Sequence, residues 1–347
     1  MSEFEKIRYT RQQDFNINEK KLIDFDFDGK KKKVYGNVNF SIFVDDYCNA
    51  DCKFCVAQLR YENIAMAYKK PKIEDDEEYF RRLDEVLSYV APLNVSVSIT
   101  GGEPTLSPRF KRIIELVDKH NIRKRTITTN GSALLKKVDG DKTNLDLLIE
   151  HKFDHLNISK THFDEDINKK IMRYSKGYCS NEDLAKIIPY ALERGLRPRL
   201  SCLLLKDGIH DVDGMAKYIE FYEKLGIDNI IFRELMDYDD KTMCNKEKMD
   251  YNERNKVKLN DVWKEVDKDP SFVPYQNLLG YYYYVEMYDY HNVRVCSESA
   301  DLKVQTEEKG NNKDTVYEMV FHPNGNLNGS WVDNEDILLK YEKKAVK

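Results

Sequence analysis

Three of the seven cysteines lie within eight residues, in the stretch VDDYCNADCKFCVAQLR, where Cys48, Cys52 and Cys55 have the spacing C-x3-C-x2-C. Thiolates on one tight loop can ligate a metal, and a cubane iron–sulfur cluster has four corners that cysteine usually holds. Three cysteines would leave one iron open, and an incomplete coordination sphere is how metal sites bind a substrate or cofactor. Two alternatives stay open here: a zinc site completed by a remote ligand such as His120 or another cysteine, and a chance grouping of loop thiols.

A second motif, SITGGEPTLS, places Gly101, Gly102 and Glu103 directly after an apolar, β-branched run. Two glycines let a ligand approach the backbone closely, and Glu103 supplies an acceptor carboxylate for a cation such as an amino group. A Gly-Gly pair after a strand is by itself more often a turn. Because the same chain also has the three-cysteine loop, a ligand site is favoured over a simple turn.

These motifs need a scaffold, and the chain alternates short apolar runs with helical periodicity. Between the runs, segments such as IEDDEEYFRRLDEVLSYV repeat apolar residues along one helical face. Strand alternating with helix predicts an α/β fold with a parallel sheet, and six repeats predict a partial (β/α)6 TIM-like barrel rather than the full eight. Such barrels place their active sites at the carboxyl ends of the strands, where both motifs stand. The predicted strands are 38–44, 94–100, 125–129, 154–159, 199–205 and 228–235.

The sequence predicts three regions. Residues 1–36 form a polar, irregular N-terminal extension, in which the basic run Lys30–Lys33 is expected to be a solvated turn. Residues 37–238 form the barrel. Residues 239–347 form a small α+β appendage that is expected to close one end of the barrel and cap the substrate. In this appendage we expect a polar helix over 245–269, a hairpin turn at 322–326, and strand-like runs at 281–288, 292–296, 301–306, 315–321 and 326–331.

Composition bounds the function class. The 347 residues are 41% hydrophobic with 23 Tyr and 15 Phe, which is enough apolar material for a globular core. A net charge of −5 with no long basic run does not suggest a nucleic-acid duplex as partner. Without a signal-like or membrane-spanning apolar run, we expect a cytoplasmic protein with no membrane partner. Seven cysteines are an odd number, so reduced thiols and metal ligation are expected rather than a disulfide framework.

Together the two motifs resemble the radical S-adenosylmethionine (SAM) superfamily, whose hallmark is CxxxCxΦC, here with Phe54 as the aromatic residue. The resemblance implies an enzyme in which Cys48, Cys52 and Cys55 hold one [4Fe–4S] cluster and SAM chelates the open iron. It implies that an electron from the cluster cleaves SAM to a 5′-deoxyadenosyl radical, which abstracts a substrate hydrogen. A flavodoxin- or ferredoxin-type protein would supply the electron. The Gly-Gly-Glu-Pro stretch resembles the family element that receives the SAM amino group.

Over residues 38–238 the chain is most similar to the molybdenum-cofactor GTP cyclase branch of that superfamily. The matching stretches are TITTNG, LNIS, RPRLSCLLLKDGIHD and IIFRELM. The resemblance implies these positions in the site: Thr128, Thr129 and Asn130; Ser159 near the SAM carboxylate or ribose; Arg199 toward an anionic substrate group; and Met236 near the adenine.

The chain departs from that branch after residue 238, where only Cys244 and Cys296 occur, far apart. A second, auxiliary cluster is therefore not expected. Cys202 in the fifth strand and Cys296 in a C-terminal strand are candidate thiols for donating a hydrogen atom to a substrate radical. The alternative is that each is a small buried hydrophobe.

The function predicted from these features is a radical SAM enzyme with one cluster that acts on a small polar substrate, anionic and nucleotide-like or sugar-like. One alternative keeps the cofactors and makes the substrate a ribosomally made peptide, matured by epimerisation or crosslinking. An alternative of another class is a non-catalytic iron–sulfur or zinc module.

Overall fold

Six parallel strands form the centre of the fold. The computed structural model describes residues 7, 10–11, 13–16, 21–36, 38–238 and 243–343. Within them the six strands pair in parallel in the order of the chain. The predicted α/β fold with a partial (β/α)6 barrel is confirmed. The strands are β4 (Asn39–Phe43), β5 (Ser96–Thr100), β6 (Lys124–Thr129), β9 (His155–Ser159), β10 (Arg197–Leu203) and β11 (Asn229–Arg233).

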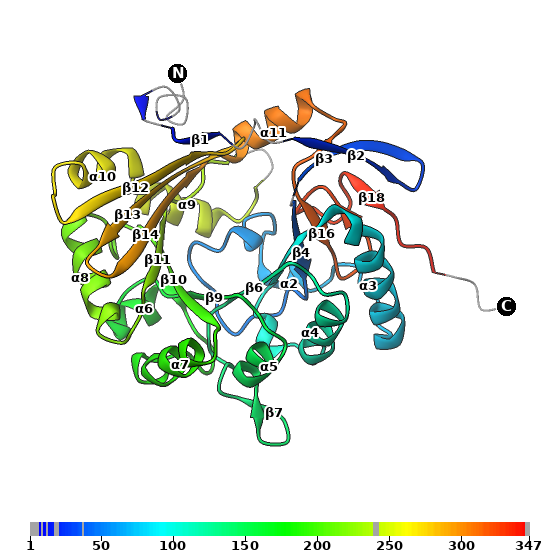
Figure 1. Ribbon diagram of the computed structural model, residues 1–347, viewed down its shortest axis with the longest axis horizontal. Coiled ribbons are helices and arrows are strands. Elements are labelled where there is room, and N and C mark those ends of the chain that lie inside the picture. The colour runs from blue at the N-terminus through cyan, green and yellow to red at the C-terminus, as the bar shows by residue number, and fades with distance from the viewer. Residues whose placement is uncertain are drawn as a thin grey trace.

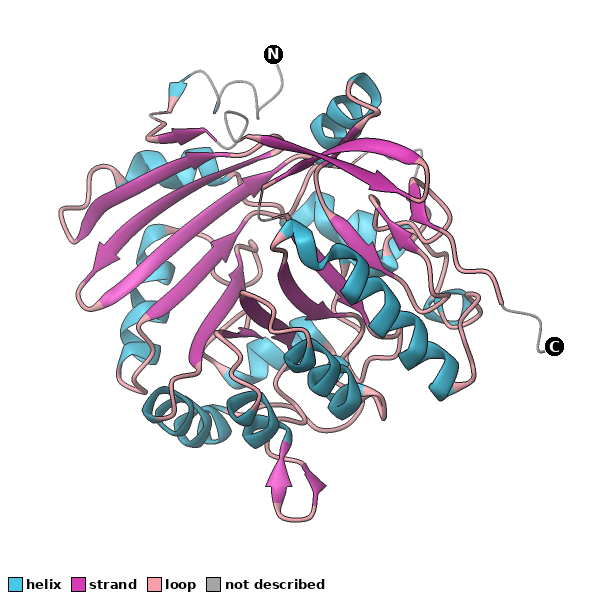
Figure 2. Cartoon of the chain, turned by 45° about the vertical axis from the view of Figure 1, so that its right-hand side comes forward, coloured by secondary structure: helices cyan, strands magenta, loops and turns pink. Residues whose placement is uncertain are grey.

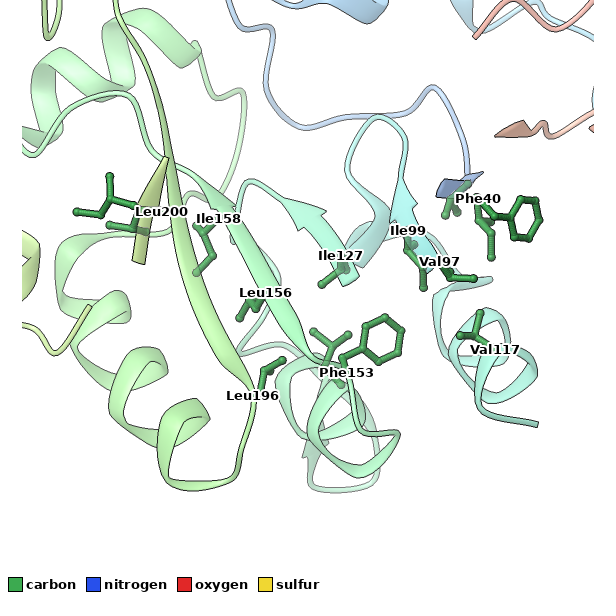
Figure 3. Close-up of a cluster of buried hydrophobic side chains, with 14 of the residues drawn as sticks. Phe40, Val97, Ile99, Val117, Ile127, Phe153, Leu156, Ile158, Leu196 and Leu200 are labelled. Carbon is green, nitrogen blue, oxygen red and sulfur yellow. The ribbon is translucent and has the colours of Figure 1, made fainter. Parts of the chain in front are cut away.

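Helices cover the outer, convex face of this curved sheet (Figure 1). Strand residues alternate between buried positions that face the helices and half-buried positions that face the concave side, as on β5 and β6. The buried set packs with helix residues into one core, part of which is drawn in Figure 3. The helices between the barrel strands are α3 (Asp76–Val90), α4 (Phe110–Lys119), α5 (Asn144–Glu150), α6 (Glu165–Met172), α7 (Asn181–Glu193) and α8 (Val212–Glu223).

Several short elements complete the connections of the barrel. The hairpin of β7 and β8 projects away from the body of the protein (Figure 2). None of the described helices is both long and apolar enough to cross a bilayer. The short elements are η2 (Val56–Gln58), α2 (Ile64–Ala67), η3 (Ala91–Leu93), η4 (Pro104–Leu106), β7 (Lys137–Asp139) and β8 (Lys142–Thr143).

The strands of the C-terminal region extend both edges of the barrel sheet. Strand β14 (Val293–Ala300) pairs in parallel with β11 and continues into β13 (Tyr283–Tyr290) and β12 (Phe272–Leu279). At the other edge β16 (Met319–Phe321) pairs in parallel with β4, followed by β17 (Leu327–Asn328) and β18 (Ile337–Leu339). The division at residue 238 stays a prediction, and residues 239–242 lie outside the described part. The strands of this region lengthen the sheet at its two sides, and the expectation that the region closes one end of the barrel and caps the substrate stays a prediction.

Two predictions in the C-terminal region are corrected in detail. The run 301–306 is not a strand but opens helix α11 (Leu302–Asn311), because the Asp301 carboxylate accepts hydrogen bonds from the N–H groups of Lys303 and Val304 and caps the helix. The polar helix is two helices, α9 (Lys246–Asn255) and α10 (Leu259–Val266). The hairpin at 322–326 is confirmed, since β16 and β17 pair antiparallel.

The N-terminal extension is more regular than predicted. Strands β2 (Leu22–Phe27) and β3 (Lys30–Tyr35) form a hairpin, so Lys30–Lys33 lie in a strand and not in a turn. The turn residues are Asp28 and Gly29, whose φ angles of 54° and 83° fit the Asp-Gly type I′ turn. Two short strands join sequence-distant parts: β15 (Thr315–Val316) pairs with β3, and β1 (Phe15–Asn16) pairs with β12.

Candidate active site

The three clustered cysteines lie in the loop that follows β4, at the carboxyl end of that strand. All three are half-buried free thiols. The loop is held by the segment after α6, where Arg173 has a left-handed φ of 49°. The N–H of Asp51 donates to the Arg173 carbonyl at 3.2 Å, and the N–H of Lys53 donates to the Ile171 carbonyl at 3.1 Å. The cysteine loop is therefore fixed by backbone contacts with a segment more than one hundred residues away in the sequence.

The three thiols share one electrostatic environment. Burial, together with the charges of Glu103 and Cys55, raises the pKa of the Cys48 thiol to about 12. Burial, together with the charges of Cys55 and Cys48, raises the pKa of Cys52 well above its usual value. Three groups that oppose one another's ionisation lie close together. Bound iron would remove this repulsion, because thiolates are the species that ligate metal.

The hydrogen bonds of these sulfurs also fit metal ligation. Sγ of Cys48 accepts from the N–H of Ala50 at 3.4 Å and from Nδ2 of Asn130 at 3.9 Å, and Cys55 accepts from backbone N–H groups. In contrast, the thiols of Cys179, Cys202 and Cys244 donate to backbone carbonyls. Sulfurs that only accept N–H bonds are typical of cluster thiolates, whose potential such bonds tune. The cysteine loop therefore fits the expected cluster.

A site for one metal ion is a different arrangement. Within the described residues, no three His, Cys, Asp or Glu side chains stand close enough together to hold a single ion. A zinc site needs such a group of ligands, so the described residues do not support the zinc alternative.

The Gly101–Gly102 turn lies directly against the chain that leads into the cysteine loop. The N–H of Gly102 donates to the Asp45 carbonyl at 2.7 Å, and the N–H of Glu103 donates to the Tyr47 carbonyl at 2.8 Å. A Cβ on Gly102 would overlap backbone atoms of Asp46 and Tyr47. The protein's own segment before Cys48 therefore approaches these glycines closely, and their contact with SAM stays a prediction.

The carboxylate of Glu103 is buried and already hydrogen-bonded within the protein. Oε1 accepts from Thr129 Oγ1 at 2.6 Å and from the N–H and hydroxyl of Thr105, and Oε2 accepts from the N–H of Asn130 at 2.6 Å. Asn130 then donates through Nδ2 to Asn49 Oδ1 at 2.9 Å. Glu103 thus joins the carboxyl ends of β5 and β6 to the cysteine loop. A contact from Glu103 to the SAM amino group stays a prediction.

The two candidate hydrogen-donor thiols lie on opposite faces of the sheet. Cys202 is fully buried in the core between sheet and helices, and its thiol donates to the Thr161 carbonyl at 3.3 Å. Cys296 is half-buried and pairs in register with Ile231, which itself pairs with Ser201, the neighbour of Cys202. Successive side chains of a strand alternate between faces, so Cys296 faces the concave side and Cys202 the helices. For Cys202 this placement favours the stated alternative, a small buried side chain in the core, over a hydrogen donor to a substrate radical.

The structure also places four more of the predicted positions. Thr128 and Ser159 are half-buried near the carboxyl ends of β6 and β9, on the concave side. Phe54 packs on a small apolar cluster that includes Ile171 and Leu235. Met236 is half-buried, three residues after the end of β11. Their contacts with SAM stay predictions.

Several cations lie toward the amino ends of the barrel strands, where Lys124, His155 and Arg197 are the first residues of β6, β9 and β10 and Arg197 pairs with Asp154 at 3.9 Å. Arg199 donates from Nε to Asn229 Oδ1 at 2.7 Å and has no carboxylate within ion-pair distance among the described residues. Burial, and then the charge of Arg199, lowers the pKa of Lys124. Burial and the charges of Arg199, Arg197 and Lys124 lower the pKa of His155 to about 4. Two atoms of β9, His155 Nδ1 and Asn157 Oδ1, are buried without a hydrogen-bond partner. The Arg199 guanidinium can donate to an anion, whereas Asn157 Oδ1 is an acceptor and needs a donor.

A cavity of about 200 Å³ opens beside the cysteine loop. Its walls come from the segment before Cys48, from residues 67–72, and from two C-terminal loops, of which one carries His322 and the other Asp333. The C-terminal region therefore contributes directly to the surroundings of the cysteines.

Lys248 of α9 is a contact of the cysteine loop that sequence reasoning missed. Its Nζ donates to Asp51 Oδ1 at 2.7 Å and to the Cys52 carbonyl at 2.6 Å. Nearly two hundred residues separate the partners, and the polar sequence of α9 carries no signal for such a contact.

Comparisons with known proteins agree with the geometry. The sequence profile of the radical SAM superfamily matches residues 42–219, about half of the chain. GTP 3′,8-cyclase of Aquifex aeolicus is 27% identical over 198 residues, which are 56% of each chain. The probable GTP 3′,8-cyclase of Sulfurisphaera tokodaii is 28% identical over 200 residues, or 54% of this chain and 53% of the relative. The chain thus spans about half the length of these curated relatives.

A solved structure shares the fold over a longer stretch. The crystal structure of Streptococcus suis SuiB bound to S-adenosylmethionine aligns with a TM-score of 0.54 at 17% identity. The alignment covers 88% of this chain and 63% of SuiB. At that identity the likeness concerns the fold alone.

Proposed function

This chain belongs to the radical SAM superfamily, and we propose that it is an enzyme that holds one [4Fe–4S] cluster through Cys48, Cys52 and Cys55 and binds SAM beside it. The observation that carries the proposal is the cysteine loop itself, three electrostatically coupled thiols at the carboxyl end of β4. When bound, the reduced cluster and SAM supply a 5′-deoxyadenosyl radical that abstracts a hydrogen atom from the substrate.

The chain's own residues would arrange this site in three ways. Gly101 and Gly102 let the β5 turn lie against the segment before Cys48, which sets the position of the first ligand. Glu103 and Asn130 tie the ends of β5 and β6 to the loop. A flavodoxin- or ferredoxin-type donor in the cytoplasm would supply the electron, since reduced cysteines suit that compartment.

We further propose that the substrate is a small anionic molecule, nucleotide-like or sugar-like. Burial, and then the charge of Arg233, lowers the pKa of Arg199, and a bound phosphate or carboxylate would favour its charged form. The curated relatives named GTP 3′,8-cyclase favour a nucleotide among such anions. A ribosomally made peptide is the alternative substrate. The experiment below distinguishes it from a small anionic molecule.

The cofactor proposal is tested by SAM cleavage. Anaerobically reconstituted protein, once reduced with dithionite, should convert SAM to 5′-deoxyadenosine and methionine. Cys48→Ala, Cys52→Ala and Cys55→Ala should each lose iron, sulfide and cleavage. Cys244→Ser is the matched control, since Cys244 is exposed and the serine keeps a hydrogen-bond donor. A full cluster in the triple-alanine variant would refute the proposal.

The substrate proposal is tested in two steps. GTP, ATP and inorganic triphosphate are added to wild type and to Arg199→Gln, and thermal unfolding is measured, because a ligand of the native state raises the melting temperature. We expect a rise with the wild type that the variant lacks. Candidates that bind are then offered in deuterated form, and deuterium in 5′-deoxyadenosine identifies the substrate. Deuterium transfer from a peptide and from none of the anions would favour the maturase alternative.

A further inference from the structure

Helix α9 is docked against the cysteine loop through the residues before it and its first turn, and in its second turn the centre of the Tyr251 ring lies 5.2 Å from Nζ of Lys53. The N–H groups of Cys244 and Asn245 both donate to the Leu59 carbonyl, at 2.9 and 3.0 Å. The side chain of Asn245 caps the helix by accepting from the N–H of Lys248 at 3.2 Å. This docking brings the Lys248 side chain over the segment between the first and third cysteines. Helix α9 lies outside residues 42–219, the part that matches the superfamily profile.

Lys248 is a buried charge with a defined use. Only 3% of its side chain is exposed, and a buried ammonium is costly unless hydrogen-bonded acceptors hold it. Its two acceptors are Asp51 Oδ1 and the Cys52 carbonyl, both in the cysteine loop. Asp51 is half exposed and also pairs with Arg173 at 2.6 Å, so water screens its charge. The buried Lys248 charge is screened less than that of Asp51. It favours the thiolate forms of both Cys52 and Cys55.

We propose that Lys248 is a positioning residue of the cluster site, which fixes the Cys52 segment and places one buried positive charge beside the cluster, so that the cluster has a higher reduction potential. The physical reason is that a reduced cluster carries one more negative charge than an oxidised one. A nearby cation in a poorly polarisable environment therefore stabilises the reduced cluster more than the oxidised cluster. The inference rests on the proposed function, since it assumes a cluster on Cys48, Cys52 and Cys55.

The experiment compares three variants of the full-length, reconstituted protein. Lys248→Met keeps the apolar stem without the charge, and Lys248→Arg keeps a charged donor. Lys246→Met removes an exposed lysine from the same helix and is the matched control. Iron and sulfide per chain are measured first. The midpoint potential is then measured by an anaerobic redox titration followed by electron paramagnetic resonance.

We expect Lys248→Met to titrate at a more negative midpoint than wild type, with Lys248→Arg and Lys246→Met close to wild type. A Lys248→Met variant that is folded by circular dichroism yet holds less iron than Lys248→Arg also supports the positioning role. A fully loaded Lys248→Met variant with the wild-type midpoint overturns the inference, as does a Lys248→Arg variant with the same negative shift as Lys248→Met. If wild type itself assembles no cluster, the proposed function fails, which is a distinct result.

Discussion

The carboxylate of Glu103 accepts a 2.6 Å hydrogen bond from the backbone N–H of Asn130, and the Asn130 side chain donates to Asn49 at 2.9 Å and to the Cys48 sulfur at 3.9 Å. This chain of contacts connects the ends of two barrel strands to the first cysteine. It gives a buried acid a structural task next to the proposed cluster.

Replacement of Glu103 by Gln should lower the free energy of unfolding. With the amide oxygen in the place of Oε1, the amide nitrogen faces the N–H of Asn130, which leaves a buried donor unsatisfied at a cost of about 1–3 kcal/mol. Urea unfolding of the apo-protein measures the loss, and iron per chain after reconstitution should fall too. Glu150→Gln, at an exposed helix end, is the control and should change stability little. Equal stability of Glu103→Gln and wild type would contradict the assigned role.

Replacement of Gly102 by Ala should disrupt the cysteine loop. The added Cβ would overlap backbone atoms of Asp46 and Tyr47, and backbone cannot move aside as a flexible side chain can. Overpacking of this kind costs typically about 1–3 kcal/mol, and here it displaces the segment before Cys48. Thermal unfolding and cluster content report both effects. Gly310→Ala is the opposite case, since its Cβ meets nothing within 4 Å in helix α11, and it should stabilise slightly. A Gly102→Ala variant that matches Gly310→Ala would count against the packing account.

Stability should depend on pH through His155. Burial and the neighbouring cations lower its pKa to about 4, from a usual value of 6.5. Between these values the unfolded chain binds more protons than the native protein, so the stability contribution is present above pH 6.5 and is lost as the pH falls toward 4.

The measurement is the unfolding free energy in urea across that pH range for wild type and His155→Gln. The variant should lose less stability than wild type on acidification. His210→Asn, at an exposed position, should follow wild type. Parallel pH profiles for wild type and His155→Gln would show that His155 titrates normally in the native state.

Thiol labelling should separate the cysteines by their places in the fold. In the apo-protein, iodoacetamide should modify exposed Cys244 first, half-buried Cys296 more slowly, and buried Cys202 only after unfolding. Mass spectrometry of timed digests gives the order. Native-state labelling of Cys202 at the rate of Cys296 would contradict their placement on opposite faces of the sheet.

The sequence predicted the barrel well because its signals are local. Each of the six strands is a short β-branched run between amphipathic helices, and the cysteine and Gly-Gly-Glu motifs follow the first two of them. Predictions from local signals were wrong where two such signals favoured different structures for the same residues. Residues 301–306 alternate like a strand, yet the Asp301 cap starts a helix there. The Asp28-Gly29 turn was a hairpin signal that the basic run after it concealed.

What the sequence by itself determined is the set of strands and the placing of both motifs at strand ends, because side-chain periodicity and turn chemistry act within a few residues. Only the tertiary structure decided that Cys202 faces the helices and Cys296 the concave side, since that depends on pairing with neighbouring strands. The tertiary structure also decided that Glu103 accepts a hydrogen bond from the N–H of Asn130 and that Lys248 donates to the Cys52 carbonyl in the cysteine loop. Such contacts join residues far apart in the chain, so they exist only once packing has brought the segments together.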